Sequence, residues 1–147
     1  MLRLLMFCLF LAVFIGCGLV SIDEVARVRS PTGRLDAVVV EINGGATTSF
    51  AYEVYVVPAG SATWRGKEVA SLYAAVRNDD AYGVNLRWTS GNSLLIEYLK
   101  ARNQQLDTAD TYVVGQHVKI ALRDGISDPT APGGGMLYNL RQRKLSR

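Results

Sequence analysis

The segment Tyr82-Gly-Val-Asn-Leu-Arg-Trp-Thr-Ser-Gly-Asn-Ser-Leu-Leu-Ile-Glu-Tyr-Leu99 decides the fold class. Between Tyr82 and Trp88 every second residue is apolar, which is typical of a strand with one buried face. The polar run 89–93, which includes Gly91, separates this strand from the apolar run 94–99 and favours a tight turn. We therefore predict an antiparallel hairpin over residues 82–99.

Other segments of the chain extend the same pattern. Residues 50–57 and 118–122 also alternate, and Pro58 ends the first of these runs because it cannot donate to a strand ladder. Residues 35–42 are more continuously apolar, which suits a strand covered on both faces, and Ser30-Pro-Thr-Gly33 before them is typical of a type I turn. We predict a mainly β protein: a single antiparallel sandwich or small barrel of five to seven strands, with at most one short helix.

The segment 68–77 is the one candidate for that helix. Val69, Leu72, Tyr73 and Val76 have the i, i+3, i+4, i+7 spacing of an amphipathic helix, and three alanines favour it. The same residues could form a strand, although they would lack a clean polar face. We expect a helix and leave the strand open.

The N-terminus has the layout of an export signal. Arg3 precedes an apolar run from Leu4 to Ile15, and Gly16-Cys17 follows it. This stretch resembles the lipobox signal peptide of bacterial lipoprotein precursors, which implies cleavage before Cys17 and a lipid on that residue. An uncleaved membrane anchor and a cleaved soluble form are the alternatives. With Gly18 next, the resemblance implies a location in the cell envelope, on the outer membrane and facing the periplasm.

These patterns divide the chain into five parts. Residues 1–16 are the predicted signal peptide, 17–29 a lipid-anchor linker and 30–123 a β-rich domain. Residues 124–135 read as a flexible Gly/Pro linker and 136–147 as a basic tail. Because both cysteines lie in the first 17 residues, we expect no disulfide or thiolate chemistry in the domain.

The net charge of +3 comes from the ends of the chain. Without Arg3 and the four tail cations, Arg141, Arg143, Lys144 and Arg147, the stretch 17–135 has 11 basic and 13 acidic residues. A nucleic-acid-binding domain would need a basic face of its own, so we predict no nucleic-acid partner. The tail could bind anionic lipid, dock on an acidic partner, or remain a solvated terminus.

One loop is the best candidate for a binding site. Its residues Asn43, Gly44, Gly45, Thr47, Thr48 and Ser49 combine glycines, which expose backbone N–H groups, with hydroxyls that could surround an anion or a sugar. Together with the Ser30–Gly33 turn and the alternating run 50–57, the loop resembles a pattern in small uncharacterised bacterial envelope proteins. That resemblance implies no activity, and a hairpin loop satisfying its own backbone is the competing interpretation.

The remaining polar residues do not assemble into a catalytic or metal site in the sequence. His117 is the only histidine, and the pairs Asp79-Asp80 and Asp107 with Asp110 lack the spacing of a calcium loop. Trp64-Arg-Gly-Lys67 reads as a surface turn. We expect no cofactor and no metal.

These observations favour a non-catalytic function. We expect a lipid-anchored envelope protein that binds or supports an envelope protein or polymer. A periplasmic inhibitor of a cell-wall hydrolase or toxin is the second hypothesis, with the loop 43–49 entering the enzyme's cleft. An enzyme is the third, and we predict that the chain is not one.

Overall fold

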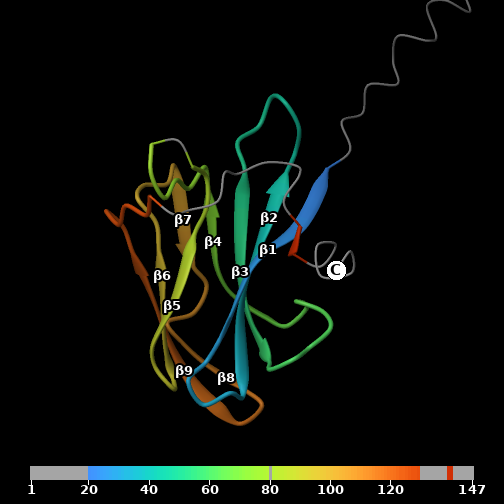
Figure 1. The fold of residues 1–147 in the computed structure, drawn as a ribbon, viewed down its shortest axis with the longest axis vertical. Coiled ribbons are helices and arrows are strands. Elements are labelled where there is room, and N and C mark those ends of the chain that lie inside the picture. The colour runs from blue at the N-terminus through green and yellow to red at the C-terminus, as the bar shows by residue number, and fades with distance from the viewer. Residues whose placement is uncertain (1–19, 80, 130–138, 141–147) are drawn as a thin grey trace, which may run out of the picture.

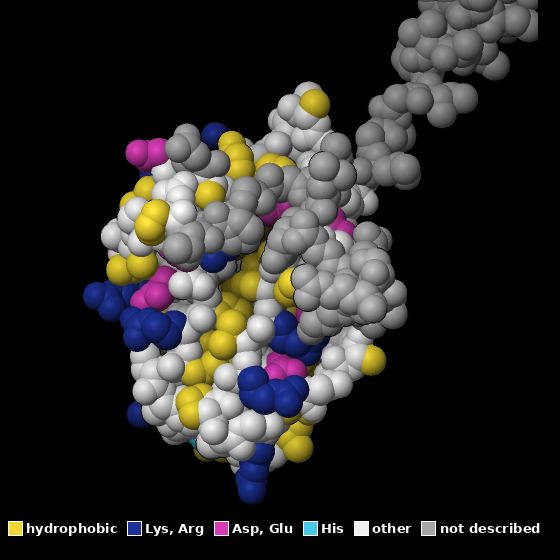
Figure 2. Space-filling model, in the orientation of Figure 1, with side chains coloured by type: hydrophobic (Ala, Val, Ile, Leu, Met, Phe, Trp, Pro, Cys, Tyr) yellow, Lys and Arg dark blue, Asp and Glu magenta, His cyan; other side chains and the backbone are white. Residues whose placement is uncertain are grey.

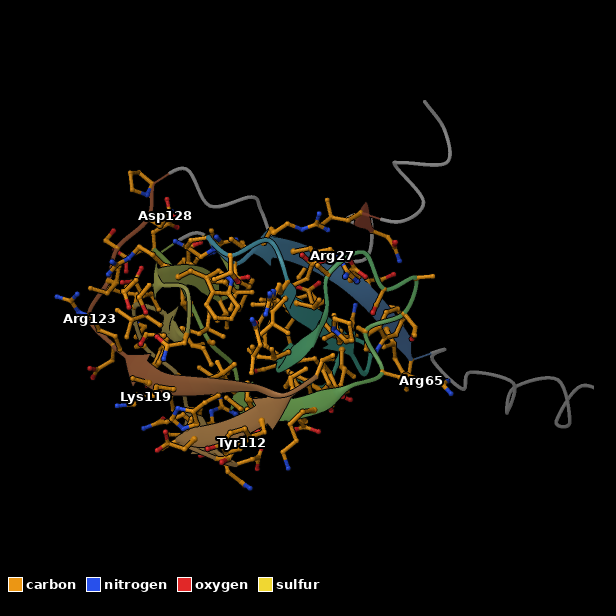
Figure 3. The ribbon with its side chains drawn as sticks, turned by 90° about the horizontal axis from the view of Figure 1, so that it is seen from below. Arg27, Arg65, Tyr112, Lys119, Arg123 and Asp128 are labelled. Atoms are coloured by element: carbon orange, nitrogen blue, oxygen red, sulfur yellow. The ribbon has the colours of Figure 1, made fainter. Side chains whose placement is uncertain are left out.

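The computed structural model describes residues 20–79, 81–129 and 139–140 and arranges them in two β-sheets. The strands in chain order are β1 (Ser21–Arg29), β2 (Leu35–Asn43), β3 (Ala51–Pro58), β4 (Lys67–Tyr73), β5 (Asn85–Ser90), β6 (Ser93–Glu97), β7 (Asn103–Leu106), β8 (Asp110–Val113) and β9 (Gln116–Arg123). One sheet has the order β1-β2-β3-β4-β7 and the other β5-β6-β9-β8 (Figure 1). Side chains fill the space between the sheets (Figure 3).

The predicted class is confirmed, with three corrections. The domain is mainly β and sandwich-like, but its sheets do not close into a barrel. Its described residues form nine strands instead of five to seven: β1, β7 and β8 were not predicted, and a helix was expected where β4 lies, with the strand left open. Strands β6 and β9 pair in parallel, whereas every other named pair is antiparallel.

The predicted hairpin is formed by β5 and β6. Leu86 pairs with Ile96 and Trp88 with Leu94, and all four belong to or pack against the main core, while Arg87 points to solvent. Tyr82 was expected on the buried face and is 44% exposed. It precedes β5, and its ring lies 5.2 Å, centroid to centroid, from that of Phe50, which packs against the main core.

Strand β2 lies between β1 and β3 in the five-stranded sheet. Leu35, Ala37 and Val39 face the main core, whereas Val38 and Val40 belong to a second buried cluster that includes Val57, Tyr55 and Trp64. Both faces of β2 are therefore covered, as its continuous apolar run predicts. The turn before β2 is also confirmed, since the Gly33 N–H donates to the Ser30 carbonyl at 2.8 Å.

The assignment of residues 17–29 to a linker is wrong for most of that range. Residues 21–29 form β1, which pairs with β2 along its length apart from an irregularity between Glu24 and Ala26. Val25 and Val28 of β1 are partly buried and pack against the main core, as does Trp88 of β5. Figure 2 shows hydrophobic side chains in the furrow between the two sheets on this side of the molecule.

The helix expected over residues 68–77 is also wrong. Lys67–Tyr73 is strand β4, paired with β3 on one side and with β7 on the other. Two neighbouring strands pair with its backbone, and Val69, Ala70 and Leu72 are buried in the main core. These non-local contacts outweigh a weak helical propensity. Ala74 follows with a φ of 54°, which ends the strand. No helix occurs in residues 20–79 or 81–129.

The predicted flexible linker 124–135 begins as part of the domain. The N–H groups of Gly125 and Ile126 donate to the carbonyls of Leu99 and Tyr98 at 3.0 and 3.1 Å. Asp128 (Figure 3) forms an ion pair with Arg77 at 3.5 Å. These contacts hold the chain against the domain through Asp128. Residues 1–19, with the signal peptide and Cys17, residues 130–138 and the cations of the tail lie outside the described residues.

Candidate functional site

The predicted loop 43–49 connects β2 to β3 and is closed by its own hydrogen bonds. The Gly45 N–H donates to Asn43 Oδ1 at 2.9 Å, and the Thr48 N–H and hydroxyl donate to the Gly45 carbonyl at 3.2 and 3.3 Å. Gly45 has a φ of 97°, and a Cβ on Gly44 would lie 2.7 Å from the Thr48 hydroxyl oxygen. The glycines, Asn43 and the Thr48 hydroxyl thus shape the loop, which agrees with the competing interpretation of a self-satisfied hairpin loop.

Tyr73, at the end of β4, connects this loop to the outer face of the sheet. Its phenolic oxygen accepts a hydrogen bond from the Ser49 N–H at 3.1 Å, and this bond lowers the pKa of Tyr73 from its ordinary value. The Arg102 guanidinium lies over the Tyr73 ring, 5.6 Å from its centroid. Both contacts hold the ring beside the loop.

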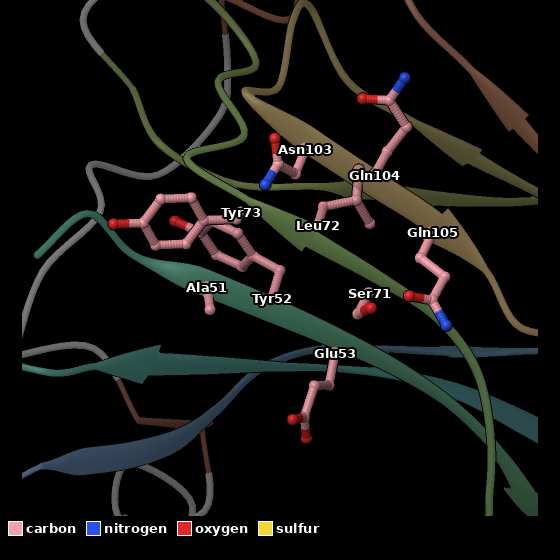
Figure 4. Close-up of a pocket in the computed structure, with 9 residues that line it drawn as sticks. All are labelled: Ala51, Tyr52, Glu53, Ser71, Leu72, Tyr73, Asn103, Gln104 and Gln105. Carbon is pink, nitrogen blue, oxygen red and sulfur yellow. The ribbon is translucent and has the colours of Figure 1, made fainter.

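A pocket with a volume of about 290 Å³ lies next to Tyr73, on strands β3, β4 and β7 (Figure 4). Two rows of directly opposed residues cross these strands, and opposed residues share a face of the sheet. One row is Ala51, Tyr73 and Asn103, and the other is Glu53, Ser71 and Gln105. Tyr52, Leu72 and Gln104 complete the lining. The surface therefore presents amides, hydroxyls and one carboxylate.

The carboxylates of Glu53, Glu68 and Asp107 interact on this face, and the Arg102 guanidinium lies over the Tyr73 ring beside the pocket. None of the described residues that line the pocket is a Lys or Arg. Burial raises the pKa of Glu68 on β4, and the carboxylates of Glu53 and Asp107 raise it further. Tyr55 donates to Glu53 at 2.5 Å. A neutral ligand with hydroxyl and amide groups would find both donors and acceptors in the lining.

The other predicted chemical residues do not join this pocket. His117 Nε2 lies 2.8 Å from Asp110 Oδ1 on the neighbouring strand, and its ring lies 5.0 Å from that of Tyr112, centroid to centroid. Among the described residues no group of three His, Cys, Asp or Glu could hold a metal ion. Trp64 packs against Val38, Val40 and Val57, and Asp80 lies outside the described residues.

Sequence reasoning missed Tyr73, Asn103 and Gln105 as site residues. Tyr73 was assigned to a helix, and residues 103–106 were assigned to no element. The sequence of a single strand does not reveal a row of polar residues that crosses three strands, because the row depends on the register between those strands. The lipidation candidate Cys17 lies outside the described residues, and in the described part of the chain no helix is long and apolar enough to span a membrane.

Fold and pocket together define a sandwich-like β domain with a polar recess on one outer face. Comparison of the chain with protein-family models, with curated proteins and with solved structures found no match.

Proposed function

We propose that this protein is a lipid-anchored envelope protein whose β domain is a non-catalytic binding module. The anchor is supported by Arg3, the apolar run Leu4–Ile15 and the Gly16-Cys17 pair. A lipid on Cys17 would tether the domain to the membrane through the short segment before β1. With Gly18 after the cysteine, the proposed location is the outer membrane, facing the periplasm.

The observation that carries the binding role is the polar pocket on β3, β4 and β7. Its amides and hydroxyls can each donate and accept hydrogen bonds, as sugar hydroxyls and N-acetyl groups do. The C–H groups of a sugar ring can also pack on an aromatic face such as that of Tyr73. We therefore propose that the ligand is a neutral glycan of the envelope that carries hydroxyl and amide groups.

Two features of the pocket suit a polymer. It is shallow and open, and at about 290 Å³ it is at the lower end of ligand pockets. Asn103, Gln104 and Gln105 are exposed along the edge strand β7, so a chain longer than one sugar could continue past the pocket. Each contact would be weak, and several repeats along a polymer would add to the affinity.

Intact-mass spectrometry of the membrane form tests the anchor. We expect a mature chain that begins at Cys17 and carries acyl groups, and we expect Cys17→Ala to leave an unprocessed precursor. A mature chain that begins at another residue, or one without acyl mass, would rule out the lipoprotein.

Titration with N-acetylated oligosaccharides, followed by NMR amide shifts, tests the pocket. We expect shifts confined to β3, β4 and β7, and at least a tenfold weaker binding when Asn103 and Gln105 are both replaced by alanine. Asn85→Ala is the matched control, because it removes a strand amide from the other sheet. Binding that is equal in all three proteins, or a preference for sulfated polysaccharide, would contradict the proposal.

The inhibitor hypothesis has one structural observation in its favour. The loop between β2 and β3 projects beyond the end of the sheet (Figure 1), and its internal hydrogen bonds give it a defined shape. A rigid projecting loop loses little entropy when it enters an enzyme cleft. Inhibition of a cell-wall hydrolase that is lost on Gly45→Val, with the oligosaccharide titration unchanged, would favour this second function.

A further inference from the structure

Three turns meet at the end of the sandwich that lies opposite the loop 43–49 (Figure 1). They connect β1 to β2, β5 to β6 and β8 to β9, and consist of residues 30–34, 91–92 and 114–115. The Lys119 N–H donates to the Asn92 carbonyl at 2.8 Å, which joins the second turn to β9. A Cβ on Gly91 would lie 2.6 Å from Thr32 Cγ2, so the first two turns are in close contact. These contacts fix the turns relative to one another.

Two adjoining hollows lie among these turns, with volumes of about 460 and 440 Å³. Arg34 and Gln116 line both hollows. Val114 lines the smaller one, and His117 lines the larger one. Among the described residues no Asp or Glu lines either hollow, whereas Glu53 lines the pocket on β3, β4 and β7. This end of the sandwich therefore presents a cation in a lining without carboxylates.

The two side chains that the hollows share are available to a ligand. The Arg34 side chain is exposed and makes no ion pair within the part of the chain that the structure describes. Gln116 Oε1 is buried and accepts no hydrogen bond from any described residue. Because buried polar atoms are nearly always hydrogen-bonded, an unpaired oxygen beside a hollow points to a donor on a ligand. Turning the Gln116 amide toward that donor would break no hydrogen bond to Oε1.

Val114 gives a second, independent indication of binding. Its φ of 49° lies in the left-handed region, and its side chain is 73% exposed. Asparagine or glycine fits this position of a hairpin turn, whereas a β-branched residue is a backbone outlier there. Backbone strain of this kind is concentrated at functional sites. Contact with a ligand accounts for an exposed apolar side chain at such a position.

We propose that this end of the sandwich binds an acidic peptide segment, at a site separate from the glycan pocket and independent of the function proposed above. Arg34 pairs with a carboxylate of the peptide, because a guanidinium donates two parallel hydrogen bonds to that group. The peptide backbone supplies the N–H that Gln116 Oε1 lacks. Val114 packs against an apolar side chain near the acidic one. A peptide is favoured over an acidic glycan because neighbouring residues of a peptide combine a carboxylate, an amide N–H and an apolar side chain.

Fluorescence anisotropy with the full-length protein in detergent micelles tests this site. The probes are labelled, end-capped hexapeptides that contain one Asp or Glu and one Leu at every spacing. A matched set carries Asn or Gln in place of the acidic residue. We expect the acidic peptides to bind and their amide counterparts to bind about tenfold more weakly, because a hydrogen-bonded ion pair is lost.

Four variants assign the binding to this end of the sandwich. Arg34→Gln should weaken the binding of acidic peptides about tenfold and leave that of the amide peptides unchanged. Gln116→Met keeps the length of the side chain without its amide, and Val114→Asn relieves the turn without the apolar contact; each should weaken binding about threefold. Arg123→Gln is the matched control, because Arg123 is an exposed cation at the far end of β9, labelled in Figure 3. Thermal melts of every variant separate weaker binding from unfolding.

The outcomes decide between this inference and its alternatives. No binding by any acidic peptide, equal binding by the amide peptides, or an equal loss in Arg123→Gln overturns it. Full binding by both Gln116→Met and Val114→Asn overturns the assignment of a peptide. Oligogalacturonate that binds more tightly than the peptides, and loses binding in Arg34→Gln, would assign the site to an acidic glycan instead. Failure of the glycan proposal is distinguishable, because neutral oligosaccharides depend on β3, β4 and β7 and not on Arg34.

Discussion

At the scale of single residues, Asp36 has the most demanding environment in the described structure. Its carboxylate is 1% exposed and accepts hydrogen bonds from Arg29 Nε and the Gly60 N–H, both at 2.9 Å, and from Arg27 Nη1 at 3.3 Å. Burial alone would raise the pKa of Asp36, but these three partners together hold it below its ordinary value. The group therefore links β1, β2 and the chain after β3 through one charge.

Asp36→Asn should lower the free energy of unfolding by about 1.5 to 3 kcal/mol near neutral pH, because hydrogen bonds to a charged group are lost. A lowered folded pKa stabilises the protein above the unfolded pKa of about 3.9, and this contribution is lost as the pH falls through the folded value. The gap between the two proteins should therefore close below about pH 4 in urea titrations. The exposed Asp79→Asn is the control and should stay within about 0.5 kcal/mol of the parent protein. A gap that is constant with pH would contradict this role.

At the scale of elements, the turn between β8 and β9 is a strained two-residue loop. Val114 and Gly115 have φ angles of 49° and 72°, the combination of a type I′ hairpin turn. A β-branched residue in this region is a backbone outlier, and Val114 is 73% exposed, so no packing compensates for it.

Val114→Asn should raise the free energy of unfolding by about 1 kcal/mol, because asparagine tolerates the left-handed region. Thermal melts of the parent protein, Val114→Asn and Val114→Thr measure the effect. Threonine keeps the branched Cβ and should give no gain. Equal stability of the Asn and Thr variants would show that the turn stores no strain.

At the scale of the whole molecule, Trp88 joins the two sheets. Its indole N–H donates to the Val28 carbonyl on β1 at 3.1 Å, and its ring packs against the main core. These contacts connect β5 with β1, where the edges of the two sheets meet in the furrow shown in Figure 2.

Trp88→Ala should lower the free energy of unfolding by about 3 to 5 kcal/mol, as large core truncations do. Trp88→Phe keeps most of the apolar surface and should cost about 1 kcal/mol for the lost hydrogen bond. Asn85→Ala, on the opposite face of β5, should stay within about 0.5 kcal/mol. Chemical denaturation of the three variants ranks their free energies of unfolding. If Asn85→Ala lowered this free energy as much as Trp88→Ala, the buried and exposed faces of β5 would have been assigned wrongly.

The sequence by itself determined the fold class, the β5–β6 hairpin, the buried face of β3 and the turn at Ser30–Gly33. These features depend on residues close together in the chain, where alternation defines a face and turn residues define a reversal. The same local rules also described the loop 43–49 as a candidate site and, equally, as a self-closed hairpin loop.

Only the tertiary structure decided which strands are neighbours. The parallel pairing of β6 with β9 and the strand at Lys67–Tyr73, which lies between β3 and the distant β7, both depend on partners far away in the chain. The pocket has the same origin, since Tyr73, Asn103 and Glu53 meet only because β4 lies between β3 and β7. The physical reason is that alternation shows which face of a strand is buried, whereas the choice and register of its neighbours are set by packing between segments remote in sequence.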